Sequence, residues 1–271
     1  SDVCSSDLLH GDFELGLATI VGSAIFNILV IPGCSVIFRD GSLEAGRDVV
    51  FLETQFYLIS VLVVIMTLTF AVIYHPTEGT ATEGSLTSLL ALIPLLFYVL
   101  YIFIQYHEVL DHVPEEHGVS LWAGWFKLIA SMALVTLGVE MLIRMVINLG
   151  EIFDTPSYFW GATILAAATS IPDLFVSIKA AQRQQSTASL TNAIGSNTFD
   201  LLVVLPAGVL VVGVVSFDID RIMPMMVFLI VATVAVLMLA RRGFELTDGN
   251  GKILLMLYVG FLAWIGWENL V

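Results

Sequence analysis

The chain has 271 residues, of which 58% are hydrophobic and only 13% are charged, and its mean hydropathy is +0.95. A soluble domain of this length does not have such a composition, whereas a polytopic helical membrane protein does. The formal net charge of −14 excludes nucleic acid as a partner, because a phosphate-binding surface needs the opposite sign.

The first residues, SDVCSSDL, have neither the basic start nor the apolar core of a signal peptide. They back-translate readily into the end of a sequencing adapter. We therefore expect residues 1–10 to be a non-native leader and the natural protein to continue upstream of them.

Eight segments have the roughly 20 mostly apolar residues that a membrane-spanning helix needs. They are expected at residues 13–37, 49–74, 86–106, 121–147, 158–181, 188–213, 222–240 and 252–270. The segments between them carry turn residues and are expected to be loops. The sequence thus predicts an all-α, polytopic membrane protein that passes several times through the cell membrane and has the lipid bilayer as a partner.

The basic residues predict an orientation. If the loop after the first span is cytoplasmic, the outside receives only Arg144 and Arg221. The inside then receives Arg39, Arg47, Lys127, Lys179, Arg183, Arg241, Arg242 and Lys252. This separation follows the positive-inside rule and predicts that both ends of the given chain face outward.

An internal repeat relates IVGSAIFNILVIPG at residues 20–33 to AIGSNTFDLLVVLP at residues 193–206. The matched pairs are Gly22 with Gly195, Ser23 with Ser196, Phe26 with Phe199, and Asn27 with Asp200. The copies lie an odd number of spans apart, so they are predicted to cross the membrane in opposite directions. Inverted repeats with an ion site near the midplane are typical of secondary transporters. Gly22 and Gly195 are expected to permit close helix approach.

Residues 161–205 carry one carboxylate in each of two neighbouring spans, Asp173 and Asp200. A charge at the bilayer centre costs about 2.5–3.5 kcal/mol on insertion scales, and it persists where it pairs or binds something. Pro172 is expected to break the fifth span and to free the carbonyl near Ala168. Such a break is tolerated where the freed group faces protein, water or a ligand. Together these features predict a cation site.

Ca²⁺ takes about 6–8 oxygen ligands, including carboxylates. Na⁺ ions can use the same oxygens, so the two cations would compete. The expected metal ligands are Asp173, Asp200, Ser170, Thr169, Ser196, Asn197, Ser23 and Asn27. Two of them have open alternatives: the Thr169 hydroxyl can bond back to the carbonyl four residues earlier, and Asn197 can join helices instead of binding an ion.

Two further polar groups are expected to be structural. The histidines and acids of residues 107–117 miss the HExxH zinc pattern by one residue, so we expect a solvated loop there. Glu140 is expected to pair with Arg144 one helical turn later.

Four segments resemble the cation/calcium antiporter superfamily, and most closely its potassium-dependent sodium/calcium exchanger branch. They are ATSIPDLFVS with Asp173, IGSNTFD with Asp200, ATIVGSAIFNIL with Ala24, and FRDGSLEAGRDVVF. The resemblance implies ten helices in two inverted sets of five, so that eight are present and the chain is N-terminally truncated. It also implies that residues 11–107 are the remainder of the first half, residues 108–120 a cytoplasmic loop, and residues 121–271 the second half.

The function implied by the resemblance is secondary antiport of Ca²⁺ against Na⁺ by alternating access, with no enzyme activity and no cofactor. The implied gating element here is the helix at residues 121–147. A carboxylate at Asp200 goes with K⁺ cotransport, although a neutral, hydrogen-bonding Asp200 with no ion of its own stays open.

Three other functional interpretations remain. The first is Ca²⁺/H⁺ antiport. The second is an intramembrane aspartyl protease with Asp173 and Asp200 as its dyad, which lacks a GxGD motif and does not explain the repeat. The third is that the given chain transports nothing.

Overall fold

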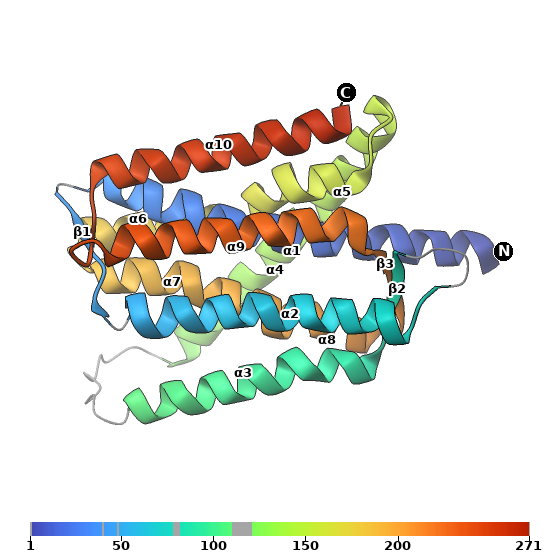
Figure 1. Ribbon diagram of the computed structural model, residues 1–271, viewed down its shortest axis with the longest axis horizontal. Helices are drawn as coiled ribbons and strands as arrows, with labels where there is room; N and C mark the ends of the chain where they lie inside the picture. Colours follow the sequence, from blue (N-terminus) through green and yellow to red (C-terminus); the bar gives the residue numbers. More distant parts are fainter. Residues whose placement is uncertain (1, 40, 48, 78–81, 110–120, 271) are drawn as a thin grey trace.

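The computed structural model describes residues 2–39, 41–47, 49–77, 82–109 and 121–270. Within them the protein is a bundle of long helices with a short two-stranded sheet at each end (Figure 1). An α-helix satisfies its backbone hydrogen bonds within the segment, which a chain surrounded by lipid requires. The predicted all-α fold class is confirmed, with four short strands added to it.

The elements of the first half are α1 (Asp2–Ile37), β1 (Leu43–Glu44), the π-helical turn η1 (Val49–Glu53), α2 (Thr54–Tyr74), β2 (Glu83–Leu86) and α3 (Ser88–Val109). The second half begins with α4 (Leu121–Phe153), α5 (Ser157–Trp160), η2 (Gly161–Leu165), α6 (Ala166–Gln182), α7 (Ser186–Phe199) and η3 (Asp200–Val204). It continues with α8 (Leu205–Val212), β3 (Val215–Asp218), α9 (Ile219–Arg241), β4 (Glu245–Leu246) and α10 (Asp248–Leu270).

Seven helical segments of the described residues are long and apolar enough to cross a membrane. They coincide with seven of the eight predicted spans, so the protein is a multi-pass membrane protein. The remaining predicted span, residues 121–147, lies within α4, where several side chains fall outside the described residues. Figure 1 shows α4 returning the chain toward the end of the bundle that holds β2, as an eighth crossing would.

The predicted helix break at Pro172 is wrong. Helix α6 continues through this residue, whose side chain lies on an exposed face where the ring displaces no neighbouring helix. Proline still leaves the carbonyl one turn earlier without its usual N–H donor. The irregular turns lie instead at η2 and η3, the second of which begins at Asp200. π-Helical turns of this kind are frequent at functional sites.

Each small sheet joins the two halves of the chain. Strand β1 pairs antiparallel with β4, and β2 pairs antiparallel with β3. The two sheets lie at opposite ends of the bundle (Figure 1). Loops were predicted at all four strands, because two to four residues are too few for a strand pattern to be recognised.

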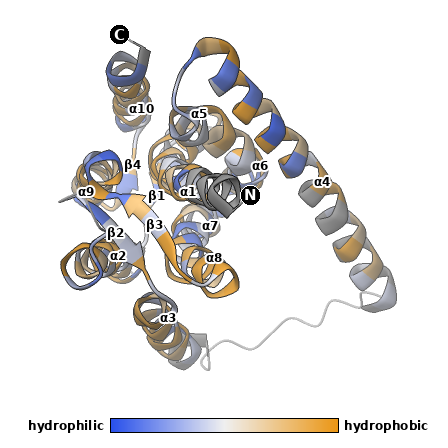
Figure 2. Ribbon diagram, turned by 90° about the vertical axis from the view of Figure 1, so that its right-hand side faces the viewer, coloured by the Kyte–Doolittle hydropathy of each residue, from blue (hydrophilic) through white to orange (hydrophobic). Residues whose placement is uncertain are grey.

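Helix α1 is the centre of the molecule. Viewed along the bundle, α6, α7, α9 and α10 surround it, whereas α4 lies at the periphery (Figure 2). From Leu15 to Val36 most α1 side chains are fully buried. Its sequence is apolar on all sides, as expected of a helix enclosed by other helices. The first copy of the repeat therefore lies in the core, against the second.

Candidate cation site

The structure brings the first repeat copy into direct contact with α6 through hydroxyl groups. Ser23 on α1 and Ser170 on α6 are buried, and their Oγ atoms form a hydrogen bond of 2.8 Å. These residues lie 147 positions apart in the sequence. Buried serine oxygens that face one another between helices are available to a bound cation.

A pair of amides joins the two repeat copies. Asn27 on α1 donates from Nδ2 to Oδ1 of Asn197 on α7 at 3.0 Å. Asn197 donates from its own Nδ2 to the carbonyl of Ala24 at 3.0 Å and to the hydroxyl of Tyr57 on α2 at 3.2 Å. The Asn27 Oδ1 atom is buried and has no hydrogen-bond partner among the described residues. An acceptor that is buried without a donor is a position where a cation would be favourable.

The two predicted carboxylates lie near each other. Asp173 comes from α6, Asp200 from the first position of η3, and each is partly buried. They are close enough for their charges to interact. Ser196 on α7 lies beside Asp173, and its hydroxyl donates to the carbonyl of Ala193 at 3.3 Å. Two like charges with little solvent around them repel one another, and a bound cation removes that repulsion.

Thr169 forms the local contact that was its open alternative. Its hydroxyl donates to the carbonyls of Leu165 at 3.0 Å and Ala166 at 3.1 Å, within its own helix. The hydroxyl hydrogen is therefore engaged by the backbone, while the oxygen keeps a lone pair. A role for Thr169 as an ion ligand stays a prediction.

Asn192 on α7 fixes that helix against α6. Its Nδ2 donates to Ser177 Oγ at 3.1 Å and to the backbone carbonyl of Asp173 at 3.5 Å. These bonds hold the carboxylate-bearing turn of α6 next to the repeat copy on α7. Asp173, Ser196 and Asn192 thus belong to one rigid helix pair.

The two repeat glycines differ in their surroundings. A Cβ atom on Gly22 would lie 2.8 Å from the Cα of Ala162, so this glycine does permit the close approach of α1 to η2. A Cβ atom on Gly195 would meet nothing within 4 Å. The expectation of close packing is confirmed for Gly22 and wrong for Gly195, because only the Gly22 backbone lies against the backbone of another element.

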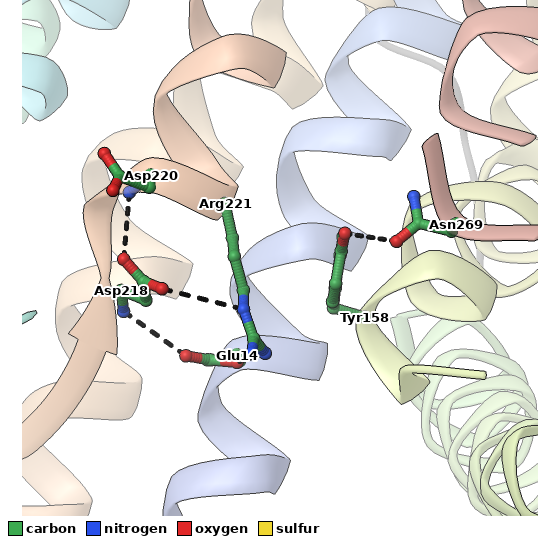
Figure 3. A network of polar contacts seen from close by, with 6 residues as sticks. All are labelled: Glu14, Tyr158, Asp218, Asp220, Arg221 and Asn269. Carbon is green, nitrogen blue, oxygen red and sulfur yellow. Dashed lines mark hydrogen bonds and ion pairs between the residues drawn. The ribbon is translucent and has the colours of Figure 1, made fainter. Parts of the chain in front are cut away.

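A second polar cluster, at the end of the bundle that holds β3, is held by ion pairs (Figure 3). Arg221 pairs with Glu14 at 3.1 Å and with Asp218 at 3.7 Å, and its guanidinium lies 5.6 Å from the ring centroid of Tyr158. Tyr158 donates a hydrogen bond to Asn269. Arg221 pairs with both Glu14 and Asp218, so we interpret the cluster as a structural clasp between α1, α5, α9 and α10.

Of the remaining predicted polar groups, Glu140 and Arg144 line a cavity together with Thr169. Glu140 and Arg144 form the expected ion pair of 2.7 Å on an exposed face of α4. Most of the histidine-rich segment, residues 110–120, lies outside the described residues. Across the described part of the chain, no group of three His, Cys, Asp or Glu side chains is placed to hold a metal ion. Ligands for a cation between the repeats must therefore include hydroxyl, amide or backbone oxygens.

Sequence reasoning missed one residue of this centre, Tyr57. It lies in an apolar run of α2 outside the repeat copies, is fully buried, and bonds to Asn197. A tyrosine in a membrane span is unremarkable in sequence, and only the contact across 140 positions identifies it.

Comparison with known proteins agrees with this architecture. The model of the family described as "Sodium/calcium exchanger protein" matches residues 4–107 and 123–267. The solved structure of native YfkE superposes with a TM-score of 0.72 and 17% sequence identity, over 97% of this chain and 78% of that one. A structure of the sodium-calcium exchanger NCX_Mj gives a TM-score of 0.63 at 20% identity, over 96% of this chain and 81% of that one.

Curated relatives align over different lengths. The sodium/calcium exchanger MaX1 of Methanosarcina acetivorans is 28% identical over 51% of this chain and 39% of its own length. The putative antiporter CaxA of Alkalimonas amylolytica is 26% identical over 93% of this chain and 78% of its own length. Human sodium/potassium/calcium exchanger 5 is 34% identical over 31% of this chain and 17% of its own length.

Proposed function

The chain belongs to the sodium/calcium exchanger protein family, a family of transporters, and from this premise we propose that it exchanges Ca²⁺ for Na⁺ by alternating access at the centre formed by α1, α6 and α7. Membership of this family shows that the chain is a cation/calcium exchanger and not an enzyme. The alternative of an intramembrane aspartyl protease is thereby excluded.

The observation that carries the proposal is the joining of both repeat copies at one buried polar centre. Ser23 meets Ser170, and Asn27 meets Asn197, beside the carboxylates Asp173 and Asp200. A packed core needs no such concentration of oxygens, because each buried polar group costs free energy unless it is paired. A cation that coordinates them compensates this cost.

The chemistry of these groups suits the proposed ions. Ca²⁺ prefers carboxylate, carbonyl and hydroxyl oxygens in a flexible arrangement. In the proposed site Asp173 and Asp200 supply the charge, and Ser23, Ser170, Ser196 and the free Oδ1 of Asn27 supply neutral oxygens, with Thr169 and Asn197 as weaker candidates. Na⁺ ions that occupy the same oxygens displace Ca²⁺, and this competition couples the two fluxes.

Alternating access requires one element to move relative to the site. Helix α4 is the candidate: it packs mainly on α5 and η2, and it lies at the periphery in the view along the bundle (Figure 2). The other helices around the site are held by α1 and by the two small sheets. A sliding α4 would open the site to each side in turn without dismantling it.

The test of this proposal is ⁴⁵Ca²⁺ uptake into proteoliposomes that contain the purified chain. An outward Na⁺ gradient is expected to drive uptake, and its collapse with a Na⁺ ionophore to abolish it. Uptake driven by a pH gradient alone would instead assign the chain as a Ca²⁺/H⁺ antiporter. The absence of uptake under either gradient would show that the given chain does not transport.

K⁺ cotransport is a second proposal, supported by the carboxylate at Asp200 and by the local similarity to sodium/potassium/calcium exchangers. The repeat places Asn27 at the equivalent position of the other copy. Asp200→Asn, which makes the two copies alike, is expected to remove any K⁺ stimulation of Na⁺-driven Ca²⁺ uptake. Wild-type uptake that does not respond to K⁺ would contradict the proposal, and K⁺ stimulation that survives in Asp200→Asn would reject the role of this carboxylate.

A further inference from the structure

A line of buried polar side chains runs from α9 through α2 and α7 to α1. Its members are Thr233, Tyr57, Asn197 and Asn27, each at most 1% exposed. The first two lie outside both repeat copies, on helices that supply no predicted ion ligand. A buried polar group costs free energy unless it is hydrogen-bonded, so the contacts of each member of this line matter.

The α9 end of this line holds Thr233 beside Tyr57. Thr233 donates from Oγ1 to the backbone carbonyl of Leu229 at 2.7 Å. Its side chain lies next to the Tyr57 hydroxyl. The oxygen of that hydroxyl accepts a hydrogen bond from Asn197 Nδ2 at 3.2 Å.

The direction of the hydrogen bonds is set at the backbone of α1. The carbonyl of Ala24 can only accept, and it receives the other hydrogen of Asn197 Nδ2 at 3.0 Å. The Asn197 nitrogen therefore faces Ala24 and Tyr57, and its oxygen faces Asn27. Asn27 must turn Nδ2 toward that oxygen, at 3.0 Å, which leaves its own Oδ1 as the end of the chain.

That terminal oxygen has a particular environment. It is buried without a donor among the residues that the structure describes. It lies one helical turn from Ser23, whose hydroxyl contacts Ser170 at 2.8 Å. The charge of Asp200 acts on the Tyr57 hydroxyl, so this carboxylate lies beside the same chain of bonds.

We propose that Tyr57 is a positioning residue for the transported cation: it holds the Asn197 amide, which in turn holds Asn27 with its carbonyl oxygen directed to the ion. The inference rests on the proposed cation site between the repeats. Asn197 then acts as a bridge, because both of its N–H groups and its oxygen are bonded. Helices α2 and α9 thereby contribute to an ion site that they do not touch.

The test uses Tyr57→Phe, which keeps the ring and its packing and removes only the hydroxyl. The amides of Asn197 and Asn27 then lose one restraint. The Ca²⁺ concentration that gives half-maximal thermal stabilisation is expected to rise roughly five- to tenfold, as for one lost buried hydrogen bond. Tyr101→Phe is the matched control. The Tyr101 hydroxyl donates to Glu53 at 3.1 Å on other helices, and its removal is expected to leave the Ca²⁺ response unchanged.

The readout is Ca²⁺-dependent thermal stabilisation of the purified, detergent-solubilised chain, which does not require transport. The decisive comparison is made in an Asn27→Ala background, where the oxygen that Tyr57 positions is absent. There Tyr57→Phe is expected to change the half-maximal concentration by less than about twofold. Thr233→Val, which removes the hydroxyl beside Tyr57 with little change in volume, is expected to act in the same direction and serves if Tyr57→Phe does not fold.

The outcomes separate two failures. A wild-type chain without a Ca²⁺ response overturns the proposed cation site, and the positioning role with it. A wild-type response that Asn27→Ala weakens, but that Tyr57→Phe and Thr233→Val leave unchanged, overturns the positioning role alone. A Tyr57→Phe effect of the same size in the Asn27→Ala background also overturns it, because Tyr57 would then act by a route other than Asn27.

Discussion

At the scale of single residues, Asp173 is the clearest mark of the proposed ion site. It lies in the middle of a membrane-spanning segment, and its recognised side-chain contact is to Ser196, a neutral group from the other helix of the pair. In the clasp at the β3 end of the bundle, by contrast, Glu14 and Asp218 both pair with Arg221. Within the described residues Asp173 forms no ion pair, and a bound cation would neutralise its charge.

Replacing Asp173 by Asn keeps its size and removes its charge. Na⁺-driven ⁴⁵Ca²⁺ uptake is expected to fall by roughly 100-fold, the equivalent of one charged ligand interaction. Asp173→Glu, which restores the charge on a longer side chain, is expected to recover part of the activity. Uptake in Asp173→Asn within a factor of two of wild type would contradict the ligand role.

Glu140→Gln is the matched control for the loss of a carboxylate in a helix. Glu140 is exposed and is paired with Arg144 within α4. Exposed pairs contribute about 0–1 kcal/mol. Its replacement is therefore expected to change the Ca²⁺ concentration for half-maximal uptake by less than about twofold.

The site residues that can be predicted from the sequence are those in the repeat and the carboxylates within the spans. Ser23, Ser196, Asn27 and Asp200 are recognisable because each copy identifies the other, and Asp173 because its charge is costly in lipid. Tyr57 and Thr233 are not recognisable. Hydroxyls are common in apolar spans, and their role depends on contacts between α2, α7 and α9 that no local pattern encodes.

At the scale of the elements, the packing of α1 against η2 decides whether the repeat copies meet. Gly22 lets the backbones approach, and a Cβ atom there would lie 2.8 Å from the Cα of Ala162. On the other side of the contact, a Cβ atom on Gly161 would lie 2.9 Å from the carbonyl oxygen of Leu15. Two glycines thus bring α1 and the start of the α6 span into backbone contact.

Gly22→Ala is expected to destabilise the protein by about 1–3 kcal/mol, because the added methyl group has to displace backbone atoms. The measurement is the midpoint of thermal unfolding in detergent. Gly208→Ala on α8 is the control, since a Cβ atom there meets nothing within 4 Å. It is expected to be neutral or slightly stabilising, because alanine has the higher helix propensity. Equal midpoints for the two variants would contradict the described packing.

Helix positions were predictable, and helix irregularities were not. Seven predicted spans agree with the structure to within a few residues, because about 20 apolar residues between polar turns have few other solutions in a membrane. The break expected at Pro172 lies elsewhere, at η2 and η3. A proline ring at an open helix face costs little, whereas a π-turn depends on the packing around it and has no simple residue signature.

At the scale of the whole molecule, the two sheets and the chain ends define two faces. Both chain ends lie toward the end of the bundle that holds β2 and β3, and β1 and β4 lie at the other end (Figure 1). The basic residues Arg39, Arg47, Arg241 and Arg242 cluster around β1 and β4 in sequence. The positive-inside rule therefore predicts that the β1–β4 end is cytoplasmic.

Single cysteines in a cysteine-free background test this orientation. His75→Cys, at the end of α2 near β2, is expected to react with a membrane-impermeant maleimide on intact cells. Arg242→Cys, between α9 and β4, is expected to react only after permeabilisation; both native side chains are exposed. The reverse pattern would invert the proposed topology and, with it, the direction in which each sheet faces.

The central claim is that one cation site lies between the inverted repeats, and anomalous diffraction from crystals soaked in Sr²⁺, a heavier substitute for Ca²⁺, tests it most directly. The account predicts a peak at coordination distance from the Asp173 carboxylate, with Asp200 and hydroxyl oxygens of both repeat copies around it, and the loss of that peak when Na⁺ replaces Sr²⁺. A peak confined to the surface or to the clasp of Glu14, Asp218 and Arg221, with the centre between α1, α6 and α7 empty, would contradict it.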